Sequence, residues 1–315
     1  MSQLKSPLVS VGVPVHNGEK YLHQALHSLI QQSYQHIEII ISDDYSSDAT
    51  SSICKSFAVK DPRITYFRQR QKLGMVDNFN FVFQKAKGKY FLWQACDDER
   101  HIDAVRILVN LLENNPQAGL AASNCTLFNE KVSFQYSYPF KIRSSSLETL
   151  KIFLRRTYTV SSLYYGLYRT LALKNIHGTH TPPFPFLLGS NDTLTIFRIF
   201  LNHQLVFSKK VLFFKRDSGY YMQKYDILQK RQFSPDVVRK IVRYSITPFV
   251  IAYITYCAIL YTHRSALSKK IKTTISIYVI KRYFRENSAY IGRIFIGLLY
   301  LTSGLKQKLF GLQKN

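Results

Sequence analysis

Apolar and polar residues follow two alternating patterns along the N-terminal third of the chain. Short runs rich in β-branched and aliphatic residues, such as LVSVGV at 8–13 and IEIII at 37–41, are typical of buried strands. Between such runs, apolar residues recur at helical spacing, as they do at 18–32. The patterns predict strands at 8–13, 37–41, 64–67, 89–94 and 118–128, and helices at 18–32, from an N-cap at Ser47 or Asp48 to Lys60, at 78–86 and at 103–115.

This order of elements predicts an α/β fold. Strands that are apolar along their whole length and alternate with helices indicate a mostly parallel sheet, covered by helices on both faces. Right-handed crossovers then bring the C-terminal ends of the strands to one edge, where ligands bind in open α/β sheets.

Two pairs of carboxylates follow strands of this predicted sheet. Asp43 and Asp44 come after the second strand, and Asp97 and Asp98 after the fourth. We expect both pairs at the same edge, where they would repel one another unless a cation or hydrogen-bond donors of a ligand lay between them. In the alternative interpretation, each pair only caps the helix that follows it.

Several common nucleotide and catalytic motifs are absent. The first strand runs into VPVHNGEKYL at 13–22, which has one glycine and no GxGxxG pattern, so a nicotinamide cofactor is not expected. The chain also lacks a P-loop and a GxSxG elbow. A bound phosphate would therefore be neutralised by a metal ion or by Lys and Arg side chains.

The net charge limits the classes of molecule that the protein is expected to bind. The 315 residues include 43 Lys and Arg against 19 Asp and Glu, a net charge of +24, which predicts an anionic partner. Nucleic acid is not favoured, because no helix-turn-helix, RRM or zinc pattern is present and the acidic pairs would have no role. The four cysteines lack metal-ligand spacing and are interpreted as buried thiols of a cytosolic protein; we see no signal peptide.

Four phrases in order resemble family 2 glycosyltransferases, which have the GT-A fold. They are PVHN at 14–17, QQSY at 31–34, DDYSSD at 43–48 and KAKGKYFLWQACDDER at 85–100. The resemblance is strong over residues 7–129 and weaker to residue 221. It implies a nucleotide-diphosphate sugar as donor and a nucleotide-sugar site formed by Pro14, Val15, His16, Asn17, Asp43, Asp44, Asp97 and Arg216.

The resemblance also implies a metal site. CDDER is similar to the family's DxD motif, so that Asp97 would face the ribose and Asp98 would bind Mg²⁺ or Mn²⁺ bridging the diphosphate. Because the third position is Glu99, the choice of metal ligand among Asp97, Asp98 and Glu99 stays open. Either Asp43 or Asp44 would accept a hydrogen bond from the base.

An inverting transferase needs a general base, which in this family begins a helix in the acceptor half. Asp192 in FLLGSNDTLTIFRIF matches that position, although Asn191 or Asp192 could simply cap the helix. Arg216, near the end of another apolar strand, is the candidate for a basic residue near the diphosphate; in the bland alternative it lies at a solvated strand end.

The C-terminal region has a different character. Residues 231–315 hold 15 Lys and Arg and 2 Asp and Glu, and residues 244–263 have no charged side chain. We predict a transferase domain at 1–230 and, at 231–315, amphipathic helices on an anionic membrane surface, with a spanning segment or a soluble helical subdomain as alternatives.

The resemblance therefore implies an inverting, metal-dependent glycosyltransferase. It would move one sugar to a hydroxyl of a glycan or lipid-linked acceptor in cell-surface polysaccharide synthesis, at the cytoplasmic face of the membrane. A catalytically inactive GT-A-like binding module is the alternative.

Overall fold

The computed structural model describes residues 6–130, 133–138, 143–144, 161–177, 191–217, 262, 265, 268–277 and 279–280. The chain divides into two compact units, Met1–Met222 and Gln223–Asn315. The predicted domain boundary between residues 230 and 231 falls outside the described residues and stays a prediction.

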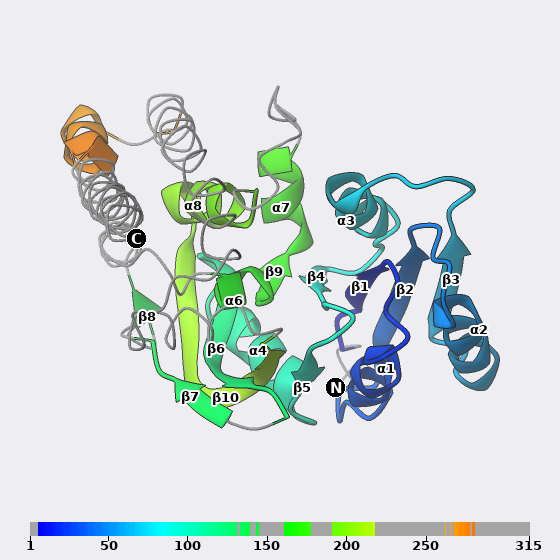
Figure 1. The fold of residues 1–315 in the computed structure, drawn as a ribbon. Coiled ribbons are helices and arrows are strands. Elements are labelled where there is room, and N and C mark those ends of the chain that lie inside the picture. Colours follow the sequence, from blue (N-terminus) through cyan, green and yellow to red (C-terminus); the bar gives the residue numbers. More distant parts are fainter. Residues whose placement is uncertain are drawn as a thin grey trace, which may run out of the picture. The chain divides into compact units, whose positions relative to one another are not determined.

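The first unit is built on a ten-stranded mixed sheet (Figure 1). Its strands are β1 (Val9–Val15), β2 (Ile37–Asp43), β3 (Ile64–Arg68), β4 (Tyr90–Trp93), β5 (Glu99–Arg100), β6 (Ala118–Phe128), β7 (Ser133–Tyr136), β8 (Arg143–Ser144), β9 (Leu167–Arg169) and β10 (Gln204–Arg216). Its helices are α1 (Leu22–Ile30), α2 (Thr50–Lys60), α3 (Met75–Gln84), α4 (Ala104–Glu113), α6 (Ser161–Tyr164), α7 (Thr170–His177) and α8 (Asn191–Asn202).

The predicted parallel arrangement is confirmed for the N-terminal strands. The order is β3-β2-β1-β4-β9-β6-β10-β5, and β3, β2, β1 and β4 are mutually parallel. The short strand β9, which the sequence pattern did not predict, lies between β4 and β6 and is antiparallel to both. Since β4 and β6 therefore run in the same direction, and β10 is parallel to β6, these strands end at one edge of the sheet.

Helices cover both faces of the N-terminal strands. α3 packs on β1 and β2, whereas α2 packs against α1 and β3, and Figure 1 shows α3 on the opposite side of these strands from α1 and α2. α1 buries Leu22, Ala25, Leu26 and Leu29, the stripe that its spacing predicted. The core continues under β4, where the fully buried Trp93 stacks on Tyr164 with 4.5 Å between ring centres.

Three helices begin elsewhere than predicted. α1 begins at Leu22 instead of residue 18, because Gly18 forms a turn whose carbonyl accepts from the N–H groups of Tyr21 and Leu22. α2 begins at Thr50, with Ala49 formally at the N-cap, although the Asp48 carboxylate does accept from the Thr50 N–H. α3 begins at Met75 instead of residue 78, after Gly74 with a φ of 88°.

In the second unit, the described residues include helical positions 269–277 and 279–280. Within the described residues, none of the helices is long and apolar enough for a membrane crossing. Of the uncharged stretch 244–263 only Thr262 is described, so the prediction of a surface or spanning segment lies outside the described part of the chain.

Candidate functional site

Both acidic pairs lie at the C-terminal edge of the sheet, as predicted. Asp43 ends β2, and Asp97 and Asp98 follow β4, its parallel neighbour across β1. A cavity of about 460 Å³ opens at the same edge, between the segments that follow β1, β4, β6 and β10. It is lined by Lys20, Tyr21, Asp97, Asn129, Glu130, Arg216 and Asp217.

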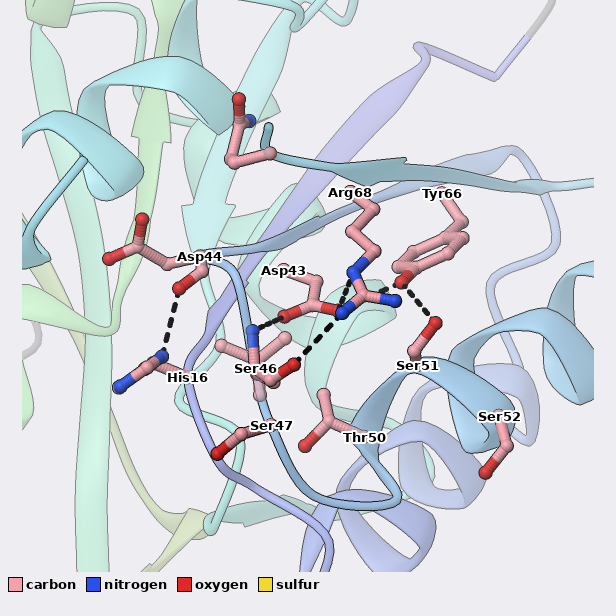
Figure 2. A network of polar contacts seen from close by, with 12 residues as sticks. His16, Asp43, Asp44, Ser46, Ser47, Thr50, Ser51, Ser52, Tyr66 and Arg68 are labelled. Atoms are coloured by element: carbon pink, nitrogen blue, oxygen red, sulfur yellow. Dashed lines mark hydrogen bonds and ion pairs between the residues drawn. The ribbon is translucent and has the colours of Figure 1, made fainter. Parts of the chain in front are cut away.

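The Asp43 carboxylate is fully buried and bonded within the protein. Its Oδ1 accepts from the Ser46 N–H at 2.9 Å, and its Oδ2 accepts from the Tyr66 hydroxyl at 2.8 Å. Arg68 lies 4.0 Å from Oδ2 and donates to the Ser46 carbonyl, so the three residues surround the carboxylate (Figure 2). Asp43 thus shapes the turn after β2 and ties it to β3.

Asp43→Ala is expected to lower the free energy of unfolding by about 3 kcal/mol, because a buried N–H and a hydroxyl both lose a charged acceptor. Chemical denaturation measures this. The control is Asp77→Ala, which removes an exposed carboxylate in the first turn of α3 and should cost about 1 kcal/mol or less. Equal stability of the two variants would show that Asp43 does not hold this turn.

Asp44 holds a second loop. Its Oδ1 accepts from the Leu73 N–H at 2.5 Å and its Oδ2 from the Gly74 N–H at 3.0 Å, at the start of α3. Asp44 therefore fixes the loop that leads into α3, and neither carboxylate of the pair caps α2, the next helix in sequence. Each carboxylate oxygen keeps a second lone pair, so these bonds leave acceptor capacity for a ligand.

His16 joins the first strand to both loops. Its Nδ1 lies 2.9 Å from the Asp44 carbonyl (Figure 2), and its Nε2 lies 2.9 Å from the Lys72 ammonium. A carbonyl accepts and an ammonium donates, so the tautomer with its proton on Nδ1 satisfies both contacts. Pro14 and Val15 are buried at the end of β1, whereas His16 and Asn17 are exposed beyond it.

Asn17 fixes the segment after β1 against the segment after β2. It has a φ of 50°, its N–H donates to the Ser46 hydroxyl, and its side-chain oxygen accepts from the Ser47 N–H. Asparagine tolerates this left-handed conformation better than most residues. The four residues Pro14–Asn17 are thereby brought beside Asp43 and Asp44, which is the grouping that the resemblance implied.

Asp97 and Asp98 differ in burial. Asp98 is 2% exposed, and its Oδ1 accepts from the Arg216 N–H at 2.7 Å. Burial first, and then the neighbouring charge of Asp97, raise the pKa of Asp98 to about 7. Burial also raises the pKa of Asp97, and the charges of Lys215 and Arg216 oppose that rise. The pair is a costly concentration of negative charge that a bound cation would relieve.

Asp97 and Asp98 suit a cation that takes only one or two ligands from the protein and the others from substrate or water. Among the described residues, no three His, Cys, Asp or Glu side chains are grouped as a metal site. Asp98 Oδ2 has no hydrogen-bond donor within that part of the chain, so it can bind a metal ion without breaking a contact. One or two protein carboxylates together with substrate phosphates are the usual donor set for Mg²⁺.

Lys215 is a basic residue of this site that sequence reasoning passed over in favour of Arg216. Its charge opposes the rise in the pKa of both Asp97 and Asp98, and its ammonium lies 5.8 Å from the centre of the Tyr165 ring. The alternation of side chains along β10 would have suggested that Lys215 and Arg216 point to opposite faces. It could not indicate which of them faces the acidic pair.

Asp192 lies in the first turn of α8, which packs against α6. Burial raises the pKa of Tyr165 well above its ordinary value, and the charges of Asp98, Tyr164, Asp97 and Asp192 raise it further. The charges of Asp192 and of the Asp97–Asp98 pair therefore all act on the same tyrosine. The residues that precede α8 lie outside the described part of the chain.

The described cysteines are poor nucleophiles. Burial is the main cause that raises the pKa of Cys54 and of Cys96 to about 12, and it also raises that of Cys125. All three are free; Cys54 and Cys125 are buried as predicted, and Cys96 is half-buried. Cys257 lies outside the described residues.

Comparison with known proteins gives the family. The model of the family "Glycosyl transferase family 2" matches residues 10–176. Glycosyltransferase GlyA of Streptococcus pneumoniae is 33% identical over 167 residues, which are 53% of this chain and 22% of that protein. Glycosyltransferase GlyG of the same organism is 39% identical over 93 residues, 30% of this chain and 31% of that protein. The matched regions thus span less than a third of these relatives.

Solved structures agree on the fold. S. aureus TarS 1–349 has a TM-score of 0.66 at 18% identity, covering 88% of this chain and 72% of that one, and it has also been solved with UDP-GlcNAc. The mannosyltransferase PcManGT from Pyrobaculum calidifontis, in complex with GDP-Man and Mn²⁺, has a TM-score of 0.51 at 15% identity and covers 90% and 87%. The predicted GT-A fold is confirmed.

Proposed function

Because this chain belongs to glycosyl transferase family 2, we propose that it transfers one sugar, with inversion, from a nucleotide-diphosphate sugar to a hydroxyl of a glycan or lipid-linked acceptor. The acceptor oxygen attacks the anomeric carbon and forms the new glycosidic bond. The bond from that carbon to the diphosphate breaks, and the nucleoside diphosphate leaves with the electron pair. The hydroxyl proton passes to a carboxylate of the protein.

The observation that carries this proposal is the Asp97–Asp98 pair, with Asp98 buried and Asp97 lining a polar cavity at the carboxyl edge of the sheet. Asp98, with Asp97 beside it, would hold Mg²⁺ or Mn²⁺. A divalent cation there supplies neutralisation of the charge that develops on the leaving diphosphate. Lys215 adds positive charge on the protein side of the same region.

The nucleotide would lie over the segments that follow β1 and β2. In this proposal the exposed His16 and Asn17 would contact the nucleotide, above the buried Pro14, Val15, Asp43 and Asp44. We assign the base contact to Asp44, which is 2% exposed and, within the described residues, bonds only to backbone N–H groups, since the fully buried Asp43 bonds to both the Tyr66 hydroxyl and the Ser46 N–H. Structures of TarS with UDP-GlcNAc and of PcManGT with GDP-Man support a nucleotide-sugar donor.

The proton acceptor in this proposal is Asp192. It lies in the first turn of α8 and shares the surroundings of Tyr165 with Asp97 and Asp98, as an acceptor site next to the donor's anomeric carbon requires. Positive charge in the C-terminal region would hold the protein on the cytoplasmic face of an anionic membrane, where a lipid-linked acceptor is found.

Asp98→Asn is expected to weaken nucleoside-diphosphate binding strongly in Mn²⁺ and little in EDTA, because the amide cannot supply the anionic ligand. Titration of UDP, GDP, ADP and dTDP, followed by the fluorescence of Trp93, the single tryptophan, measures this. The control is Asp77→Asn, which changes an exposed residue in the first turn of α3. Equal affinity of the unmutated protein with and without metal would contradict metal dependence.

A donor-hydrolysis assay addresses the inactive-module alternative. An active transferase releases nucleoside diphosphate from one member of a nucleotide-sugar panel in a metal-dependent reaction with water, whereas a binding module retains the sugar nucleotide intact.

A further inference from the structure

The side chain of Arg216 is bonded to the acidic turn rather than free in the cavity. Its NH2 group lies 3.0 Å from Glu99 Oε1, and its Nε donates to the Asp97 carbonyl at 3.1 Å. Its backbone N–H donates to Asp98 Oδ1 at 2.7 Å. One residue at the end of β10 therefore contacts all three consecutive members of the Asp97–Asp98–Glu99 turn.

The guanidinium also lies close to two aromatic rings. Its Cζ lies 4.1 Å from the centre of the Tyr21 ring and 4.4 Å from that of the Phe128 ring. Tyr21 lies in the segment after β1 and Phe128 ends β6, so the guanidinium at the end of β10 contacts two other segments of the first unit. Only 12% of the Arg216 side chain is exposed, which limits its freedom to swing toward a ligand.

We propose that Arg216 is a positioning residue, which holds the Asp97–Asp98–Glu99 turn in the geometry that binds the metal and the diphosphate. This inference rests on the proposed function of the acidic pair. It replaces the sequence-based expectation that Arg216 contacts the diphosphate. A planar guanidinium can pack against aromatic rings while it donates hydrogen bonds in two directions in its own plane. An ammonium at this position cannot reproduce that set of contacts.

The test is a titration of Mn²⁺ at fixed nucleoside diphosphate, with the same four nucleotides, for the unmutated protein and Arg216→Lys. Lysine keeps the positive charge but lacks the planar guanidinium with its several N–H donors. The Mn²⁺ concentration at half-maximal binding is expected to rise about tenfold or more, as it does when groups that orient metal ligands are removed. Nucleotide binding in EDTA should stay within about twofold, because in this proposal Arg216 does not touch the phosphate.

Arg63→Lys is the matched control. Arg63 also joins several elements, through Asp61, Gln35 and the Ile30 carbonyl, but it lies at the opposite end of β3 from the acidic edge. It should lower the melting temperature as Arg216→Lys does without moving the Mn²⁺ midpoint. A general loss of stability is thereby separated from a loss of positioning.

Arg216→Gln extends the test by removing the charge as well. If Arg216 were a direct phosphate ligand, Arg216→Gln would weaken binding in EDTA as much as in Mn²⁺, and that result would overturn the proposal. An unchanged Mn²⁺ midpoint in folded Arg216→Lys would overturn it too. Failure of the unmutated protein to bind any nucleotide with metal would instead contradict the proposed function itself, so the two failures are distinguishable.

Discussion

Asp192→Asn is expected to lower turnover by about two to four orders of magnitude while donor affinity changes less than about threefold. Asparagine has nearly the same size as aspartate and keeps one oxygen acceptor, but it does not take up a proton at neutral pH. In the proposed reaction the acceptor hydroxyl must lose its proton as it attacks. The loss should therefore appear in the chemical step and not in donor binding.

The measurement is the release of nucleoside diphosphate from the donor that the panel identifies, with Trp93 fluorescence giving donor affinity. Asn191→Ala is the matched control, because it alters the first residue of the same helix and leaves the carboxylate in place. It should retain turnover within about threefold, since weakening a helix start costs stability rather than proton transfer. If Asp192→Asn turns over normally, Asp192 only stabilises α8, and Asp217, which lines the cavity, becomes the next candidate.

The sequence predicted the sheet edge because period and burial are local properties. Five strands and the four helices between them were located from apolar patterns, and the acidic pairs were placed together by the direction of parallel strands. β9 could not be predicted in this way. It has three residues, and only its pairing with Tyr90, Phe91, Leu120 and Ala121, far away in the chain, makes it a strand.

The hydrogen-bond and packing partners of the site residues could not be predicted from the sequence either. The sequence shows that Asp44 follows a strand, but not that Leu73 and Gly74 donate to it across 29 and 30 positions of the chain. The same holds for Arg216, which a sequence places at a strand end. The rings of Tyr21 and Phe128 near its guanidinium, and the Glu99 carboxylate that it contacts, come from three other segments. Long-range contacts thus determine whether a basic residue can bind a phosphate or instead positions other residues.

The excess of positive over negative side chains lies in one part of the chain. Residues 1–130 hold 13 Lys and Arg and 13 Asp and Glu, so the excess of +24 lies entirely in residues 131–315. The N-terminal part, with the proposed nucleotide site, is therefore neutral overall. An anionic partner would therefore bind to residues 131–315, which include the C-terminal region.

The full-length chain is expected to sediment with vesicles that contain phosphatidylserine and to remain free with neutral vesicles. Each Lys or Arg near an anionic surface contributes about 1 kcal/mol. Lys269, Lys270 and Lys272 lie on a helical segment whose Ile277 and Ile280 are 47% and 42% exposed, so basic and apolar side chains are both available to a membrane surface.

Replacing these three lysines by glutamate should weaken vesicle binding by at least about 3 kcal/mol, or roughly 100-fold. Lys55, Lys60 and Lys87, which are exposed in the neutral N-terminal part, give a matched control when they are changed to glutamate. That variant has the same net charge and should bind the vesicles nearly as the unmutated chain does. An equal loss in both variants would mean that overall charge, and not this segment, governs binding.

Salt and alkali distinguish the remaining alternatives for residues 231–315. About 1 M salt reduces the Debye length to about 3 Å, so a surface anchor should be released at least in part. A segment that spans the bilayer would resist both salt and alkaline carbonate, and residues 244–263 would then be the crossing segment. A chain that stays free of anionic vesicles even at low salt would instead make 231–315 a soluble helical subdomain, and the acceptor would have to reach the enzyme without a membrane anchor.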